Sequence, residues 1–298
     1  MRRFRFVILI LCFSLWASLA VAQITMQVEL GLQRTVRLEK WNPVTVQVHN
    51  TGPPFVGTLG VRVWRGSDFR QDRHVITFTR PIELPYRSRK QFAFDVPITS
   101  ITHPVEVLLQ QGDQVLVHQQ FNLREALNAE HIILGLTHDL GLDFLATSFQ
   151  RHTRVVYLAP HDLPKRWAGY DSVSAVVVKG ISLHTLTQRQ ATALRHWIAR
   201  GGNLVVAGDA HYAILQEPLL RGLLPVAAIG VQQLAGLPAF AEHYGIPMPA
   251  TPLLAVRSKL LHGQLLVGTE ALPLLAERSF GKGRVIFLAV DYAAEPLA

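Results

Sequence analysis

The chain has 298 residues, with 29 lysines and arginines against 21 aspartates and glutamates, which gives a formal net charge of +8. The basic residues are scattered rather than gathered into a stripe with interleaved aromatic side chains, so the charge argues against a nucleic-acid partner. The only cysteine is Cys12, which excludes disulfides, thiolate metal sites and a cysteine nucleophile from the later part of the chain.

The first 22 residues have the pattern of an export signal. Three arginines within residues 2–5 precede an uncharged apolar run at residues 6–22, and Ala20-Val21-Ala22 before Gln23 fits a small-x-small cleavage site. The pattern predicts a signal peptide at residues 1–22 and a periplasmic or otherwise extracytoplasmic protein. The alternative is an uncleaved inner-membrane anchor, because about 17 apolar residues are at the lower limit for a spanning helix. In that case the N-terminal segment would associate the protein with the membrane.

Residues 23–125 alternate between apolar and polar side chains. Val44, Val46 and Val48 share one face of a predicted strand, and further short strands are expected at residues 56–64, 92–96, 105–109 and 115–117. Short strands at intervals of about ten residues are typical of an antiparallel β-sandwich. The stretch WNPVTVQVHNTG at residues 41–52 also resembles Ig-like modules found at the front of bacterial envelope proteins. This resemblance implies an Ig-like β-sandwich domain.

The pattern changes to alternating strands and helices from residue 126 onward. A continuous apolar strand is expected at residues 131–136, followed by a helix that Thr137 or Asp139 could cap, with Leu142, Leu145 and Phe149 on its buried face. A second strand follows at residues 154–158. The proline-containing stretch 160–170 is expected to be irregular with one turn around Trp167, and a buried parallel strand is expected at residues 173–178.

The clearest helix is expected between residues 188 and 200. Thr187 and Gln190 form a capping box, Ala191, Leu194, Trp197 and Ile198 form an apolar stripe, and Gly201 suits the position after the helix end. Beyond it we expect a strand at 204–207, a helix around 212–220, a Pro/Gly-broken region at 223–252, β-like runs at 253–257, 265–268 and 274–280, and a last strand at 284–290. This succession predicts an α/β flavodoxin-like domain with a mostly parallel sheet over residues 126–298.

Residues 131–292 resemble the class I glutamine amidotransferase-like superfamily, and in particular its uncharacterised bacterial envelope members with an Ig-like N-terminal domain. The segments that carry the resemblance are YDSVSAVVV at 170–178, LTQRQATALRHWIARGGNLVVAG at 186–208 and GKGRVIFLAVD at 281–291. Active members place a cysteine nucleophile after the strand that corresponds to residues 204–207, but here the turn reads Gly208-Asp209-Ala210. The resemblance therefore implies the scaffold with its catalytic cysteine missing, and no glutaminase activity.

Ligands of open parallel sheets bind beyond the carboxyl ends of the strands. Several polar residues should arrive at this edge, and we interpret a group of them as a candidate ligand-binding site: His138, Asp139, Lys179, Gly208, Asp209, His211 and Asp291. His161 and Asp162 follow another strand in the same way. We predict no bound metal and no cofactor, because no H-x-x-x-H or H-x-H spacing is present and an aspartate after a strand commonly forms a turn or caps a helix.

Two functions from different classes follow from these observations. The first is a non-catalytic envelope protein that acts as an interaction or ligand-binding module for an unknown envelope partner. The alternative is a metal-assisted hydrolase that uses Asp209 and His211 at the strand ends to hold a metal-activated water. The tryptophans at 41, 64, 167 and 197 are interpreted as core or domain-interface residues.

Overall fold

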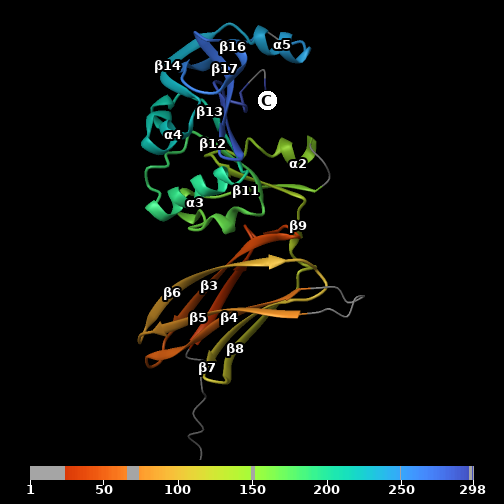
Figure 1. Ribbon diagram of the computed structural model, residues 1–298, viewed down its shortest axis with the longest axis vertical. Helices are drawn as coiled ribbons and strands as arrows, with labels where there is room; N and C mark the ends of the chain where they lie inside the picture. The colour runs from red at the N-terminus through yellow and green to blue at the C-terminus, as the bar shows by residue number, and fades with distance from the viewer. Residues whose placement is uncertain (1–23, 66–73, 149–151, 249, 295–296, 298) are drawn as a thin grey trace, which may run out of the picture.

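The computed structural model describes residues 24–65, 74–148, 152–248, 250–294 and 297, and the predicted signal peptide at 1–22 lies outside these ranges. Strands are the dominant structure in the described chain. They form two parts stacked along the long axis of the molecule, one built from β-sheets alone and one from a sheet with helices (Figure 1). Each part has its own hydrophobic core. No helix in the described ranges is long and apolar enough to cross a membrane.

The first part consists of two antiparallel sheets that share one core. One sheet has the order β1-β3-β6 and the other has the order β5-β4-β7-β8. The side chains of Val44, Val46 and Val48 are fully buried between the sheets while their neighbours face outward, which confirms the predicted alternation. The bounds are β1 Ile24–Leu30, β3 Lys40–Asn50, β4 Phe55–Arg65, β5 His74–Leu84, β6 Ser88–Ile98, β7 Val105–Gln111 and β8 Gln114–Phe121.

The second part is built around a seven-stranded mixed sheet in the order β11-β10-β12-β13-β18-β17-β16. The first five strands of this order are parallel to one another, and β17 and β16 add antiparallel pairs at one edge. Numbered along the chain, the parallel strands lie in the order 2-1-3-4-5. The bounds are β10 His131–Leu136, β11 Thr153–Tyr157, β12 Val173–Lys179, β13 Asn203–Ala207, β16 Gln264–Thr269, β17 Leu272–Phe280 and β18 Gly283–Leu288.

Helix α3, Gln188–Ala199, forms as its local signals predict. The Thr187 side chain accepts a hydrogen bond from the Gln190 backbone N–H, and the Gln190 side chain in turn accepts one from the Thr187 N–H, which completes the capping box. The Gln190 amide is also buried and donates to the carbonyls of residues 160, 161 and 163. The buried stripe contains Ala193 rather than the predicted Ala191, because Ala193 lies one turn before Trp197.

Three predictions about the rest of this part need correction. The expected helix after β10 is reduced to α2, Phe144–Ser148, and Phe149 lies outside the described residues. The helix expected around 212–220 is split into a 3₁₀ helix, Tyr212–Gln216, and α4, Pro218–Leu223, because a proline fits only the first turn of a helix. The Pro/Gly-broken region contains a nine-residue strand, β14 Val226–Leu234, and a helix, α5 Pro238–Tyr244.

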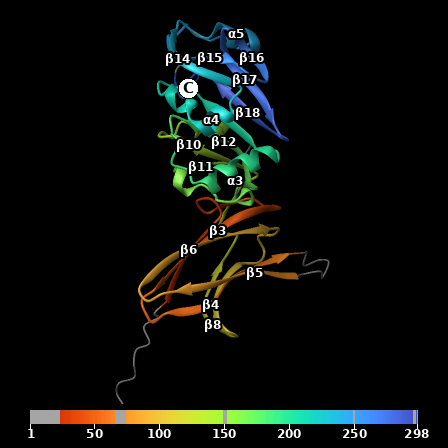
Figure 2. The same cartoon turned by 60° about the vertical axis from the view of Figure 1, so that its left-hand side comes forward.

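Strand β14 pairs with β15, Leu253–Leu260, as a separate two-stranded sheet at the far end of the second part (Figures 1 and 2). The register shifts between Ala228 and Gly230, and a bulge of this kind interrupts the alternation from which strands are recognised. The runs expected at 265–268 and 274–280 lie in β16 and β17, as predicted.

The two parts are tied together by more than a linker. The short strands β2, Thr35–Val36, and β9, Leu127–Asn128, pair in parallel at the junction. Further hydrogen bonds cross it, among them Gln33 Nε2 to the Tyr157 carbonyl at 2.6 Å, Arg37 Nη1 to Ser174 Oγ at 3.1 Å, and the Trp41 N–H to Asp171 Oδ2 at 3.1 Å. The connection near residues 123–130, where we place the domain boundary, is therefore not a free linker. The β2–β9 pairing and the hydrogen bonds across the junction fix it in place.

Candidate functional site

Three of the predicted residues meet at the carboxyl ends of the parallel strands: Asp139 and Asp291 lie on either side of Lys179, the last residue of β12. Lys179 Nζ lies 2.7 Å from Asp139 Oδ2, which follows β10, and 2.7 Å from Asp291 Oδ1, which follows β18. The lysine side chain is 5% exposed, whereas the carboxylates of Asp139 and Asp291 are 50% and 31% exposed. Lys179 Nζ also lies 4.6 Å from the centre of the Tyr292 ring, in range of a cation–π contact.

The surroundings of this network favour the charged forms of Asp139 and Lys179. Burial by itself raises the pKa of Asp139, but hydrogen bonds from Lys179, Thr137 and the Gly141 N–H outweigh it and lower the pKa below the usual 3.8. Burial also lowers the pKa of Lys179, and its hydrogen bonds to Asp139 and Asp291 outweigh this and raise the pKa above the usual 10.5. Lys179 is thus held as an ammonium ion, which has no free electron pair for nucleophilic or base chemistry.

The chain that follows β18 packs against the loop after β10, at the carboxyl ends of the parallel strands. In a sheet with this strand order the crevice lies between β10 and β12, where the order reverses. Asp291 accepts a hydrogen bond from the Ala293 N–H at 2.8 Å, and a Cβ added at Gly141 would lie 2.8 Å from Ala293 Cβ. Residues 291–293 therefore pack directly against the loop after β10. Together with Lys179 they place the protein's own side chains at the carboxyl ends of β10 and β12.

The remaining predicted residues do not join this network. Asp209 Oδ1 accepts a hydrogen bond from the His211 N–H at 2.7 Å, and Asp209 Oδ2 lies 3.2 Å from His211 Nδ1. Asp209 thus forms a turn just before the 3₁₀ helix at 212–216, whose N-terminus has no side-chain cap. Asp209 forms the turn that is expected of an aspartate after a strand, and it does not cap the next helix, because its carboxylate accepts a hydrogen bond within the loop itself. His138 is exposed at the same edge.

Gly208 has a packing role. A Cβ at this position would lie 2.5 Å from Val256 Cγ2 and 2.7 Å from the Ala289 carbonyl oxygen, so only glycine fits between these neighbours. His161 and Asp162 lie 3.4 Å apart, and both are largely exposed. Within the described ranges, no group of three or more His, Cys, Asp or Glu side chains is arranged to hold a metal ion.

A second polar cluster was not foreseen from the sequence. The Ser182 hydroxyl donates to Glu217 Oε1 and lies 2.5 Å from His184 Nδ1, and the Leu183 N–H donates to Glu217 Oε2 at 2.9 Å. In a serine hydrolase the carboxylate orients the histidine and not the serine. Here Glu217 accepts the hydrogen bond from the serine directly. The cluster therefore links the loop after β12 to the start of α4. Ser182 and Glu217 are 35 positions apart in the sequence, so no local pattern predicts their contact.

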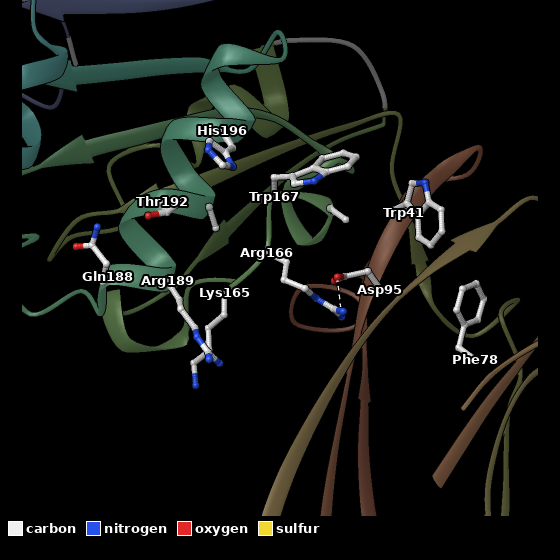
Figure 3. Close-up of a pocket in the computed structure, with 12 residues that line it drawn as sticks. Trp41, Phe78, Asp95, Lys165, Arg166, Trp167, Gln188, Arg189, Thr192 and His196 are labelled. Carbon is white, nitrogen blue, oxygen red and sulfur yellow. Dashed lines mark ion pairs between the residues drawn. The ribbon is translucent and has the colours of Figure 1, made fainter. Parts of the chain in front are cut away.

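The junction between the two parts contains a pocket of about 590 Å³, which we call the junction pocket (Figure 3). One wall comes from α3 and the loop before β12, and the opposite wall comes from β3, β5 and β6. No stretch of sequence predicts this pocket, because its residues come from both parts. The lining residues that carry functional groups are Trp41, Asp95, Lys165, Arg166, Trp167, Gln188, Arg189, Thr192 and His196.

Ion pairing leaves the junction pocket positively charged. Arg166 Nη2 pairs with Asp95 Oδ2 at 2.8 Å. Burial raises the pKa of Asp95, and Arg166 opposes this effect. Asp95 is the only carboxylate among the described residues that line the pocket. Lys165 and Arg189 both line the pocket (Figure 3), and in the described part of the chain neither has an ion-pair partner.

Three of the four predicted tryptophans lie in the core or at the junction, whereas Trp64 is partly buried against His103. Trp197 is 5% exposed and stacks on Tyr170 with ring centres 5.7 Å apart. Trp41 is 37% exposed at the pocket and meets Phe78 edge-on at 5.9 Å. The guanidinium group of Arg200 lies 3.9 Å from the ring centre of Trp167 and covers one of its faces. Two indole rings thus border the pocket.

A family model described as a domain of unknown function (DUF8726) matches residues 23–124. This range coincides with the all-β part of the structure. No curated protein matches the sequence.

Similar solved structures are remote. An exo-β-1,4-mannosidase from Opitutaceae bacterium strain TAV5 is 13% identical with a TM-score of 0.39 and covers 57% of this chain. The match spans 32% of the mannosidase, or about a third of its length. A CARDB domain from Pyrococcus furiosus is 14% identical with a TM-score of 0.23, over 35% of this chain and 79% of that domain. The sporulation control protein Spo0M from Bacillus subtilis is 17% identical with a TM-score of 0.22, over 34% of this chain and 49% of its own.

Proposed function

We propose that the chain is a non-catalytic, extracytoplasmic protein of the bacterial cell envelope that acts as an interaction or ligand-binding module. The single observation that carries this proposal is the network around Lys179. The ammonium group is held between Asp139 and Asp291 at 2.7 Å from each, and residues 291–293 pack against the loop after β10 beside it. A catalytic site needs an accessible reactive group. At this edge the reactive group is the Lys179 ammonium, and two carboxylates neutralise its charge.

The architecture supports a scaffold role. We assign residues 23–125 to an Ig-like β-sandwich and residues 126–298 to a flavodoxin-like domain, because the parallel strands follow the order 2-1-3-4-5 that is typical of that fold. The resemblance to amidotransferase-like envelope proteins agrees with the same strand order. With Asp209 in a turn where active relatives carry a cysteine, the domain is proposed to be a degenerate member of that superfamily. Its partner is proposed to be another envelope protein or an envelope ligand.

The competing function is a metal-assisted hydrolase, and the Asp209–His211 contact at 3.2 Å is the observation in its favour. Calorimetric titration of zinc and manganese into the mature protein and into Asp209→Asn separates the two. A matched control is Asp162→Asn, since Asp162 also faces a histidine on an exposed loop at 3.4 Å. We expect no saturable metal binding in any of the three proteins. Micromolar binding that Asp209→Asn loses and Asp162→Asn retains would overturn the proposal.

A further inference from the structure

We infer that the junction pocket binds a carboxylate-bearing sugar, of the uronic acid type. The inference rests on the proposed function, because it names the ligand class and the location of a site in a binding module. Three features of the pocket lead to this inference: its positive charge, the two indole rings that line it, and the uncharged polar side chains of Gln188 and Thr192.

The charge of the pocket selects an anion. Arg166 is neutralised by Asp95 at 2.8 Å, whereas Lys165 and Arg189 line the same pocket without a carboxylate partner in the described ranges (Figure 3). Two positive charges that line one pocket repel each other, and an anion bound in the pocket relieves the repulsion. A guanidinium group matches a carboxylate with two parallel hydrogen bonds, and the ammonium group adds a further donor.

The aromatic rings select a ligand with a flat apolar face. Arg200 covers one face of Trp167, and Trp167 also lines the pocket. Trp41 is fixed by the edge of Phe78 and stays partly exposed. Indole rings held in this way offer a rigid apolar surface at low entropic cost. The C–H face of a pyranose ring is the complement of such a surface.

Two polar side chains on the α3 wall of the pocket favour a hydroxyl-rich ligand. Gln188 and Thr192 lie on the exposed side of α3 and line the pocket, and among the described residues their side chains accept or donate no hydrogen bond. An amide and a hydroxyl can each donate and accept, as sugar hydroxyls require. An extended peptide is disfavoured because the edge strand β6 already uses its Ala93 carbonyl to accept from Arg166 at 3.3 Å.

The test is calorimetric titration of the mature protein with an oligogalacturonate trimer and with the same trimer as its uncharged methyl ester. We expect saturable binding of the acid and at least about tenfold weaker binding of the ester, as a lost charge-assisted contact implies. The double variant Lys165→Gln/Arg189→Gln should reduce the affinity by about 10- to 100-fold. Its control is Arg257→Gln/Lys259→Gln, which removes the same net charge from exposed positions on β15 and should leave the affinity unchanged.

Three results would overturn the inference. The first is no binding of the acid trimer, and the second is equal binding of acid and ester. The third is tighter binding of triglutamate or adenosine monophosphate than of the sugar acid, which would assign the pocket to an acidic peptide or a nucleotide. Trp41→Ala gives an independent readout, since loss of the ring should weaken the sugar acid but not inorganic phosphate. None of these results depends on the metal titration at Asp209, so failure of this inference and failure of the proposed function are distinguishable.

Discussion

Replacing Lys179 with methionine removes the positive charge at the centre of the strand-end network and keeps most of the apolar stem. The variant leaves Asp139 and Asp291 facing each other, because both carboxylates lie 2.7 Å from the same nitrogen in the wild type. Removing one partner of a fully buried ion pair costs about 3–5 kcal/mol, and removing one from an exposed pair costs about 0.2–1 kcal/mol. Since Lys179 is buried but its partners are 50% and 31% exposed, we expect a loss of about 2–3 kcal/mol at neutral pH.

The pH dependence of this loss distinguishes charge from packing. The pKa of Asp139 is lowered in the folded protein, so its contribution to stability is present above its unfolded pKa and disappears as the pH falls through its folded pKa, below 3.8. The pKa of Lys179 is raised, so its contribution is present below the unfolded value and disappears as the pH rises through its folded pKa, above 10.5. The cost of Lys179→Met should therefore be largest between these limits and shrink in acid.

The assay is urea unfolding of wild type, Lys179→Met and the exposed control Lys259→Met, at neutral pH and in acid. The control should change the free energy of unfolding by less than about 0.5 kcal/mol, as surface substitutions usually do. A cost for Lys179→Met that is equally large at both pH values would show that packing and not the ion pairs holds the segment. No cost at either pH would refute the network as a stabilising element.

Three further predictions concern the core, the helix cap and export. Trp197→Ala should lower the free energy of unfolding by about 3–5 kcal/mol, because it empties the space beside Tyr170; an unchanged urea midpoint would contradict this. Gln190→Ala should lower the free energy of unfolding by about 2–3 kcal/mol, since it removes half of a capping box and leaves buried carbonyls unpaired. The control Gln188→Ala, on the exposed side of the same helix, should lower it by less than about 0.5 kcal/mol. N-terminal sequencing of the protein from the envelope fraction should begin at Gln23, and an intact Met1 on a cytosolic species would refute export.

The elements that could be predicted from the sequence are those whose signals are local. The strand at 44–48 can be predicted because only one face is buried, so apolar and polar side chains alternate with a period of two residues. Helix α3 can be predicted because its cap, its apolar stripe and the glycine that ends it lie within 15 residues. The sequence does not reveal strand β14, because the bulge between Ala228 and Gly230 breaks the alternation of apolar and polar residues. The 3₁₀ helix at 212–216 and α4 resemble one continuous helix in the sequence unless Pro218 is recognised as the first residue of a second helix.

The candidate site could be predicted in part. Residues at the ends of neighbouring parallel strands must meet at one edge, and so Asp139, Lys179 and Asp291 were selected together. The sequence could not show that residues 291–293 turn back across the edge, nor that Asp209 would pair within its own loop. The junction pocket depends on how the two parts are placed relative to each other, which local patterns do not encode.

The closure of the strand-end crevice can be measured directly by amine-specific labelling of the native protein, read by mass spectrometry at each lysine. A side chain that is 5% exposed and paired to two carboxylates should react far more slowly than the exposed Lys165. In urea the two lysines should react at similar rates. If Lys179 in the native protein is labelled as fast as Lys165, then the crevice is open to solvent, and the account of this edge as a closed, non-catalytic surface is contradicted.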